Sequence, residues 1–210
     1  MSVKTVIKAQ CGPKSFLYLH KIKTIALINQ TSIQFDKVIA RCREIFTKKN
    51  RDYGTAWRIL RPESITDQIF IKAQRIRSLE AKGNSRVNEG IEPEYIGIVN
   101  YCVIALIQLS LGKEAPVEIP TDEILKKYDE EIAITRQLME DKNHDYGEAW
   151  RDMRIATFTD LILMKLFRVK QIEDNNGQTI VSEGVDANYR DIINYSVFAL
   201  IRIDEEEAKK

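Results

Sequence analysis

Residues 48–61 read KKNRDYGTAWRILR, and residues 141–154 read DKNHDYGEAWRDMR. The likeness continues downstream: SITDQIFIKAQRIRSLE at 64–80 matches TFTDLILMKLFRVKQIE at 157–173, and VNEGIEPEYIGIVNYCVIALI at 87–107 matches VSEGVDANYRDIINYSVFALI at 181–201. The offset is 93 residues as far as Glu173 and 94 from Gly177 onward, so one residue was inserted in a loop that we expect to be exposed. The chain therefore contains one structural unit written twice, which we call copy one and copy two.

Each copy is expected to be helical throughout, because no strand-like alternation bounded by turn signals occurs. Apolar residues spaced three and four apart predict a first helix over about 32–50. Gly54 suits the left-handed conformation of a turn, and a short helical segment at 56–60 follows it. A second long helix begins near Ser64. The third, at about 93–111, is apolar nearly all round and should be the most buried element.

Polar residues at the predicted helix starts are interpreted as caps. Ser64 with Asp67, and Thr157 with Asp160, have the spacing of an N-terminal capping pair, and Thr121 is placed to cap the first helix of copy two. The predicted fold is all-α, with two units of three to four helices. Their apolar third helices are expected to pack across a pseudo-twofold axis within the chain, as in an intramolecular pseudo-dimer.

The predicted organisation has five segments: a basic N-terminal tail that we expect to be loosely held or disordered (1–30), the first helical unit (31–111), a linker (112–120), the second helical unit (121–203) and a solvated charged tail (204–210). The tail prediction rests on composition, because the first 35 residues contain five lysines and no Asp or Glu. The linker prediction rests on two prolines.

Composition excludes several classes of function. The 32 basic and 31 acidic residues leave a net charge of +1, which argues against nucleic acid and against an anionic membrane surface as partners. Three cysteines without C-x-x-C spacing argue against a disulfide framework or a zinc site, and favour a cytoplasmic location. The most apolar run, 96–111, is interrupted by polar residues and is too short to span a membrane, so we expect a buried helix.

Comparison of the two copies also restricts the chemistry, because working residues of a duplicated site should recur. His144 corresponds to Arg51, and Cys42 to Thr135, so a duplicated site uses neither His nor Cys as base, nucleophile or ligand. Any duplicated metal site must then use oxygen ligands, which favours Mg²⁺ or Mn²⁺.

The recurring cationic and aromatic residues are candidates for binding a phosphate or nucleotide. They are Lys49, Asn50, Tyr53, Trp57, Arg58, Arg61, Lys72 and Arg75 in copy one, and Lys142, Asn143, Tyr146, Trp150, Arg151, Arg154, Lys165 and Arg168 in copy two. Cations three residues apart share one face of a helix. Guanidinium groups suit phosphate oxygens, and an aromatic ring suits a base. The same residue types equally suit ion pairs and core anchors, and both interpretations stay open.

Recurring acidic residues are candidates for catalysis and for metal binding. Asp52 and Asp145 are the candidate catalytic carboxylates, although they could equally cap the segment that follows. The candidate metal ligands are Asp52, Glu80, Glu89, Asp145, Glu173 and Glu183. Asn100 and Asn194 lie in the apolar third helices, where a buried amide either sets the register across the pseudo-dimer interface or faces a ligand.

Two blocks, K-N-x-D-Y-G-x-A-W-R and N-Y-x-V-x-A-L-I, resemble the type 1 nucleotide-modification-associated domain in both copies. The resemblance covers most of 36–201 and implies a small helical protein with a connection to nucleotides. A weaker likeness is to the all-α nucleotide pyrophosphatases, which include MazG and use Mg²⁺. Their E-x-x-E signature does not recur in both copies here.

Two hypotheses follow. In the first, the protein binds a nucleotide or a nucleotide-like phosphate, with Mg²⁺-dependent hydrolysis as a further step in which Asp52 positions water or metal. In the second, it is a non-catalytic helical scaffold that binds a protein partner or self-associates as a homo-oligomer.

Overall fold

The structure, a computed structural model, describes residues 13–82, 90–112 and 114–209, with side chains from Gln30 onward. Six α-helices account for most of this part of the chain: α1 (Pro13–Tyr53), α2 (Pro62–Lys82), α3 (Glu92–Leu111), α4 (Thr121–Tyr146), α5 (Ile155–Asp174) and α6 (Val185–Glu207). Two short 3₁₀ helices, η2 (Ala56–Ile59) and η3 (Ala149–Asp152), follow α1 and α4. The described residues contain no strand, so the prediction of an all-α fold built from two related helical units is confirmed.

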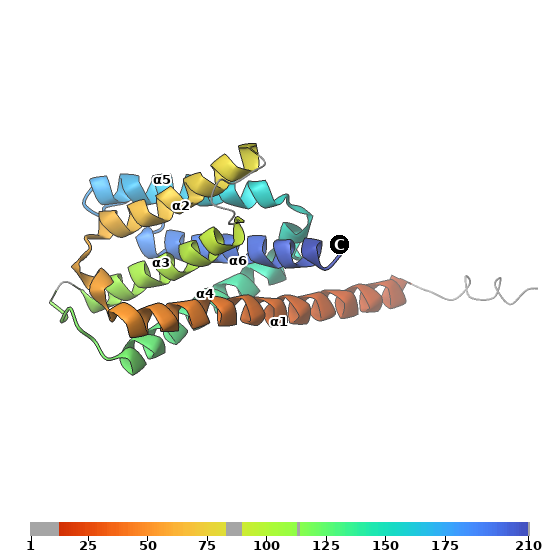
Figure 1. Cartoon of the computed structure of the whole chain (residues 1–210). Coiled ribbons are helices and arrows are strands. Elements are labelled where there is room, and N and C mark those ends of the chain that lie inside the picture. Colours follow the sequence, from red (N-terminus) through yellow and green to blue (C-terminus); the bar gives the residue numbers. More distant parts are fainter. Residues whose placement is uncertain (1–12, 83–89, 113, 210) are drawn as a thin grey trace, which may run out of the picture.

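Corresponding helices of the two copies lie side by side in three layers (Figure 1). The outer layers are α2 with α5 and α1 with α4, and the middle layer is α3 with α6. The middle helices are buried on nearly every side, as their all-round apolar sequence predicts. By length and composition α3 could cross a membrane, but 67% of its apolar stretch is buried among the other helices, as in a core helix.

The two copies exchange equivalent contacts. Tyr95 Oη lies 2.7 Å from Thr159 Oγ1, and the equivalent atoms of Tyr189 and Thr66 lie 2.8 Å apart. Each threonine also donates to a glutamate on the second helix of the other copy: Thr159 of α5 to Glu80 of α2 (3.0 Å), and Thr66 of α2 to Glu173 of α5 (2.6 Å). The outer helices repeat the pattern, with ion pairs Asp67–Lys170, Asp160–Arg77, Arg43–Asp129 and Arg136–Asp36. Contacts of this reciprocal kind are those that a twofold relation produces.

The predicted capping residues have other positions. Helix α2 begins at Pro62 and α5 at Ile155, so Ser64 and Thr157 lie inside the first turn. Pro120 precedes α4, so Thr121 is its first residue rather than its cap. The capping prediction was therefore wrong, and proline explains the earlier start of α2, because its fixed φ suits the first helical position. Asp67 and Asp160 pair with Lys170 and Arg77 instead.

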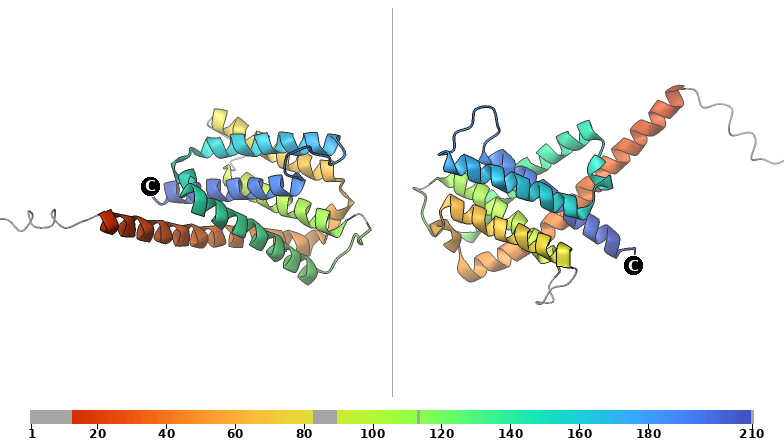
Figure 2. Two further views of the ribbon diagram at one scale, coloured as in Figure 1. Left: turned by 180° about the vertical axis from the view of Figure 1, so that it is seen from behind. Right: turned by 90° about the horizontal axis from the view of Figure 1, so that it is seen from above.

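Two predicted ends of helices also differ. Helix α1 begins at Pro13 rather than near Ser32, because neither glycine nor proline interrupts the chain after Pro13 before Gly54. Its N-terminal part extends past the other helices (Figure 2); residues 1–12 of the predicted tail lie outside the described residues. Asp204 and Glu205, which we expected in a solvated tail, belong to α6 and pair with Arg41 of α1 and Arg151 of η3.

The buried Asn100 joins three helices. Its Nδ2 donates to the carbonyl of Cys42 in α1 (3.0 Å), and its Oδ1 accepts from Tyr128 Oη in α4 (3.0 Å). Asn194 makes the equivalent bond to the carbonyl of Thr135 (3.4 Å). The Tyr128 bond joins the two copies, whereas the bonds to Cys42 and Thr135 each join two helices of one copy.

Candidate functional site

The D-Y-G segment forms a tight turn at the end of α1 and of α4. Gly54 (φ +58°) and Gly147 (φ +62°) adopt the predicted left-handed conformation, and their N–H groups bond to the carbonyls of Asn50 (2.8 Å) and Asn143 (2.9 Å). Asn50 closes the turn again, because its Nδ2 donates to the Gly54 carbonyl (3.0 Å). The backbone therefore accounts for the recurrence of the glycine. The asparagine differs between the copies, because Asn143 Nδ2 donates to Met139 Sδ (3.0 Å) rather than to the glycine carbonyl.

The other polar residues of this turn face solvent. Tyr53 is 69% exposed and Tyr146 is 75% exposed. Asp52 is exposed, and Asp145 lies 3.2 Å from His144 Nδ1 at the surface. Arg61 and Arg154 are also exposed. The candidate catalytic carboxylates thus lie outside any enclosed site in the described structure.

The two tryptophans belong to the core. Trp150 is 6% exposed and stacks on Phe198, with ring centroids 4.2 Å apart and planes within 4°. Trp57 is partly buried and packs against the same core. Packing thus accounts for the position of both rings without a ligand.

Arg58 holds the linker between the copies. Its guanidinium is buried and donates to the carbonyls of Pro116 (3.3 Å), Gly112 (3.1 Å) and Ala115 (2.7 Å), and to Oε1 of Gln108 (2.6 Å). These partners occupy its donors, so Arg58 stabilises the position of the linker.

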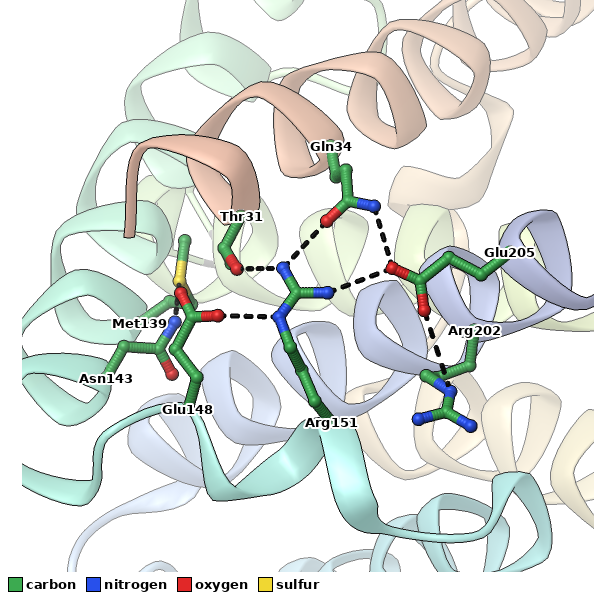
Figure 3. Close-up of polar contacts among 8 residues, drawn as sticks. All are labelled: Thr31, Gln34, Met139, Asn143, Glu148, Arg151, Arg202 and Glu205. Atoms are coloured by element: carbon green, nitrogen blue, oxygen red, sulfur yellow. Dashed lines mark hydrogen bonds and ion pairs between the residues drawn. The ribbon is translucent and has the colours of Figure 1, made fainter. Parts of the chain in front are cut away.

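Arg151, the counterpart of Arg58, lies between η3, α6 and α1 (Figure 3). It donates to Glu148 (2.6 Å), Glu205 (2.9 Å) and Gln34 (2.8 Å), and also to Thr31. Glu148 is 4% exposed and has a left-handed φ of +60°, a conformation that costs a non-glycine residue about 1–2 kcal/mol. The buried ion pair with Arg151 offsets that strain.

A third group of predicted residues converges on one carboxylate in copy two. Asp191 of α6 is 5% exposed, and its two oxygens accept from Lys142 Nζ of α4 (2.5 Å) and Lys165 Nζ of α5 (2.6 Å). Arg168 lies one turn beyond Lys165, and it acts electrostatically on Tyr195 together with Asp191 and Lys142. We call Lys142, Lys165, Arg168 and Asp191 cluster 2.

Copy one has a related arrangement. Glu94 of α3 is 5% exposed and accepts from Lys72 Nζ (3.2 Å) and Arg75 Nη1 (2.5 Å) of α2. Lys72 and Arg75 therefore share a face, as their spacing predicts. Lys49, the counterpart of Lys142, is exposed at the end of α1 and makes no ion pair or hydrogen bond with a described residue. We call Lys72, Arg75 and Glu94, together with Lys49 as the sequence counterpart of Lys142, cluster 1.

Burial and charge alter two pKa values in cluster 2. Burial raises the pKa of the Tyr195 hydroxyl, and the negative charge of Asp191 raises it further. Burial acts to lower the pKa of Lys142, but the hydrogen bond to Asp191 and its charge outweigh it, so the pKa is raised. Both groups therefore stay protonated at neutral pH. Cluster 2 contains three cations and one carboxylate, and the negative charge of the exposed Glu183 also acts on Lys142.

Glu94 and Asp191 were missed by the sequence comparison. Glu94 corresponds to Asn188, and Asp191 corresponds to Gly97, so neither acid recurs at its own position. Each acid nevertheless pairs with the second helix of its own copy, Glu94 with α2 and Asp191 with α5. Their positions in the third helix differ by three residues, about one helical turn. A search for acids that recur within one turn, rather than at one position, would have found them.

The predicted metal ligands do not come together. Glu80 and Glu173 lie in the contact between α2 and α5, where burial raises the pKa of each carboxyl. Glu183 is exposed, and Glu89 lies outside the described residues. Among the residues that the structure describes, no group of three or more His, Cys, Asp and Glu side chains is placed to hold a metal ion.

Two shallow hollows lie between α1 and α4, away from both clusters. One is lined by Arg43, Leu125 and Asp129, the other by Asp36, Ile132 and Arg136. Neither hollow includes a residue that the sequence predicted for the site, so clusters 1 and 2 are the places where predicted site residues meet.

The family model for Nucleotide modification associated domain 1 matches the chain twice, at residues 49–109 and 142–203. Neither the curated proteins nor the solved structures contain a match to the chain. The two matched segments span more than half of the chain and coincide with the two copies, so the chain belongs to this family as a tandem pair of domains.

Proposed function

We propose that this tandem member of the Nucleotide modification associated domain 1 family binds a nucleotide through its phosphate at the cationic clusters beside α3 and α6. The observation that carries the proposal is the convergence of cations on a single, nearly buried carboxylate in both copies. The family's link to nucleotide modification supports a nucleotide as the source of the phosphate.

The surplus of positive charge is the physical reason. In cluster 2 the Asp191 carboxylate pairs with Lys142 and Lys165, and Arg168 lies one helical turn beyond Lys165. In cluster 1 Glu94 pairs with Lys72 and Arg75, and Lys49 corresponds in sequence to Lys142 of copy two. A phosphate dianion would balance such a surplus, and ammonium and guanidinium groups both donate strongly to phosphate oxygens. Partial burial strengthens these contacts, because water screens them less.

The proposal concerns binding of the nucleotide and does not include its hydrolysis. Hydrolysis with Mg²⁺ would need carboxylates near the bound phosphate, and Asp52 and Asp145 are exposed at the turn that ends the first helix of each copy. Release of phosphate or pyrophosphate, measured with and without Mg²⁺, is therefore an outcome to be read from the binding experiments.

Titration calorimetry of the full chain against deoxynucleoside mono- and triphosphates tests the proposal, with the unphosphorylated deoxynucleosides as matched ligands. We expect binding of the phosphorylated ligands that weakens as salt is raised. The double substitution Arg75→Gln and Arg168→Gln should weaken binding about tenfold or more, since a charge-assisted contact contributes about 1.5–3 kcal/mol. Lys126→Gln is the control, because Lys126 is 78% exposed on α4 and pairs only within its own helix in the described structure.

No heat with any phosphorylated ligand would contradict the proposal and favour the helical scaffold. Equal binding of phosphorylated and unphosphorylated ligands would also contradict it, because the base rather than the phosphate would then be recognised.

A further inference from the structure

The clusters differ at one position of the third helix, which is Gly97 in copy one and Asp191 in copy two. The Asp191 carboxylate bridges the first and second helices of its copy, through Lys142 and Lys165. At Gly97 that space is taken by the end of the Lys72 side chain: a Cβ on Gly97 would lie 2.8 Å from Lys72 Cε. Among the described residues, this position in copy one is therefore taken by the Lys72 side chain rather than by a carboxylate.

The acid of copy one does not replace this bridge. Glu94 contacts Lys72 and Arg75, which both belong to α2, and it leaves Lys49 of α1 without an ion pair among the described residues. In copy two the residue equivalent to Glu94 is Asn188, whose Nδ2 donates to the Gly184 carbonyl (2.8 Å). In the part of the chain that the structure describes, the cation on the first helix therefore pairs with a buried acid in copy two but not in copy one.

We infer that the Asp191 carboxylate occupies in copy two the position that the ligand's phosphate takes in copy one. Copy one then has a phosphate site, formed by Lys49, Lys72 and the backbone at Gly97, which becomes free when the Lys72 side chain turns away from Gly97. Copy two is closed by its own Asp191 side chain. The inference rests on the proposed function and adds to it that the two copies, though built alike, bind unequally.

The chemistry of the position supports a terminal phosphate. Two ammonium groups from different helices suit an anion with several oxygens at wide angles, and Asp191 meets that need with two. Glycine at position 97 lets such a group approach the backbone of α3, which a side chain would prevent. Lys72 is the far end of a flexible side chain and can turn toward the incoming phosphate, away from Glu94.

The test is the stoichiometry of binding, with 2′-deoxyadenosine 5′-monophosphate and inorganic phosphate as separate probes. The wild-type chain should bind one equivalent of the nucleotide. Lys49→Gln should weaken binding about tenfold, the effect of about 1.4 kcal/mol. Gly97→Asp, which recreates the arrangement of copy two, should abolish binding. Its cost to the fold is small, because the atom it displaces is the flexible end of Lys72.

The converse variant gives a gain. Asp191→Gly should open a second site, and the stoichiometry should rise to two; adding Lys142→Gln to it should return the stoichiometry to one. Circular dichroism and thermal unfolding verify that each variant folds. If Gly97→Asp does not fold, Lys49→Gln still tests the site, because Lys49 is exposed and its substitution should leave the fold intact.

Two equal sites in the wild-type chain, or full binding by both Lys49→Gln and Gly97→Asp, would overturn this inference and leave the proposed function standing. Absence of binding in the wild type and in Asp191→Gly, with both probes, would instead overturn the proposed function itself. Binding of inorganic phosphate with the same stoichiometry as the nucleotide would show that the phosphate alone fills the site.

Discussion

Arg58 and Arg151 occupy the same place in the same motif, yet they hold different partners. Arg58 donates to carbonyl groups of the linker and to Gln108, all of them neutral. Arg151 donates to two carboxylates, Glu148 and Glu205, and to polar groups of α1. In copy one the arginine binds the linker that follows α3, whereas in copy two it binds α1 of the other copy. A recurring residue can therefore keep its geometry while its electrostatic role changes.

Removal of the guanidinium should have the largest effect in copy two. Arg151→Met leaves Glu148, 3% exposed in its side chain, without its cation, and loss of a partner from a buried ion pair costs about 3–5 kcal/mol. Arg58→Met should cost less, about 1–3 kcal/mol, because the linker carbonyls are near the surface and water can replace the donor. Urea unfolding followed by circular dichroism measures both.

The comparison would fail if Arg58→Met were the more destabilising of the two. The double variant Glu148→Gln with Arg151→Met provides the control: removing both charges should recover part of the loss, because no unpaired carboxylate remains.

The two buried asparagines give the next effect. Tyr128 donates to Asn100 Oδ1, but the residue equivalent to Tyr128 is Phe35, and Asn194 Oδ1 is buried without a partner in the described structure. Tyr128→Phe should therefore cost about 1–3 kcal/mol. Phe35→Tyr should stabilise by about 1 kcal/mol if the hydroxyl reaches Asn194. Thermal unfolding of the two variants and their combination measures the effects, and a destabilising Phe35→Tyr would show that copy two has no room for the oxygen.

The glycine turns should give equal and smaller effects. Gly54 and Gly147 have φ values of +58° and +62°, and a Cβ on either meets no atom within 4 Å. Gly54→Ala and Gly147→Ala should each cost about 1 kcal/mol from the left-handed backbone alone. Denaturant midpoints measure this cost. Unequal losses would indicate that the neighbouring residue, Thr55 in one copy and the strained Glu148 in the other, alters the turn.

The smallest effect concerns pH. Burial raises the pKa of the Glu80 and Glu173 carboxyls, so each holds its proton to higher pH in the folded state than in the unfolded state. Their contribution to stability is therefore greatest below the ordinary glutamate pKa and is lost as pH rises through the folded-state value. Glu80→Gln with Glu173→Gln should make the unfolding temperature higher at neutral pH and less dependent on pH. A larger dependence on pH in this variant would contradict the sign.

Local patterns were enough to predict much of the fold. Helical periodicity located the long helices, the apolar third helices predicted the buried layer, and glycine in D-Y-G predicted the left-handed turn. Patterns near helix starts were less informative, because Ser64 and Thr157 carry capping spacing but Pro62 and Ile155 begin the helices. The flanking chain decided where α2 begins, because proline suits the first helical position.

For the candidate site, recurrence in both copies identified candidate residues but did not separate structural residues from those that meet at the clusters. Arg58, Trp57 and Asn50 recur and lie in structural contacts, whereas Lys72, Arg75 and their counterparts recur and meet at the clusters. The partners Glu94 and Asp191 escaped the comparison, because one helical turn moves a side chain little in space but three positions in sequence.

The sequence by itself determined that one helical unit occurs twice, which segments form its helices, and which cations are shared by both copies, because periodicity and repetition are properties of the chain alone. Only the tertiary structure decided which of those cations are enclosed by carbonyls and carboxylates, which face solvent, and that the position filled by Asp191 in copy two is taken by the Lys72 side chain in copy one. Those outcomes depend on which helices come into contact, and charge pairing across helices far apart in the chain leaves no local pattern.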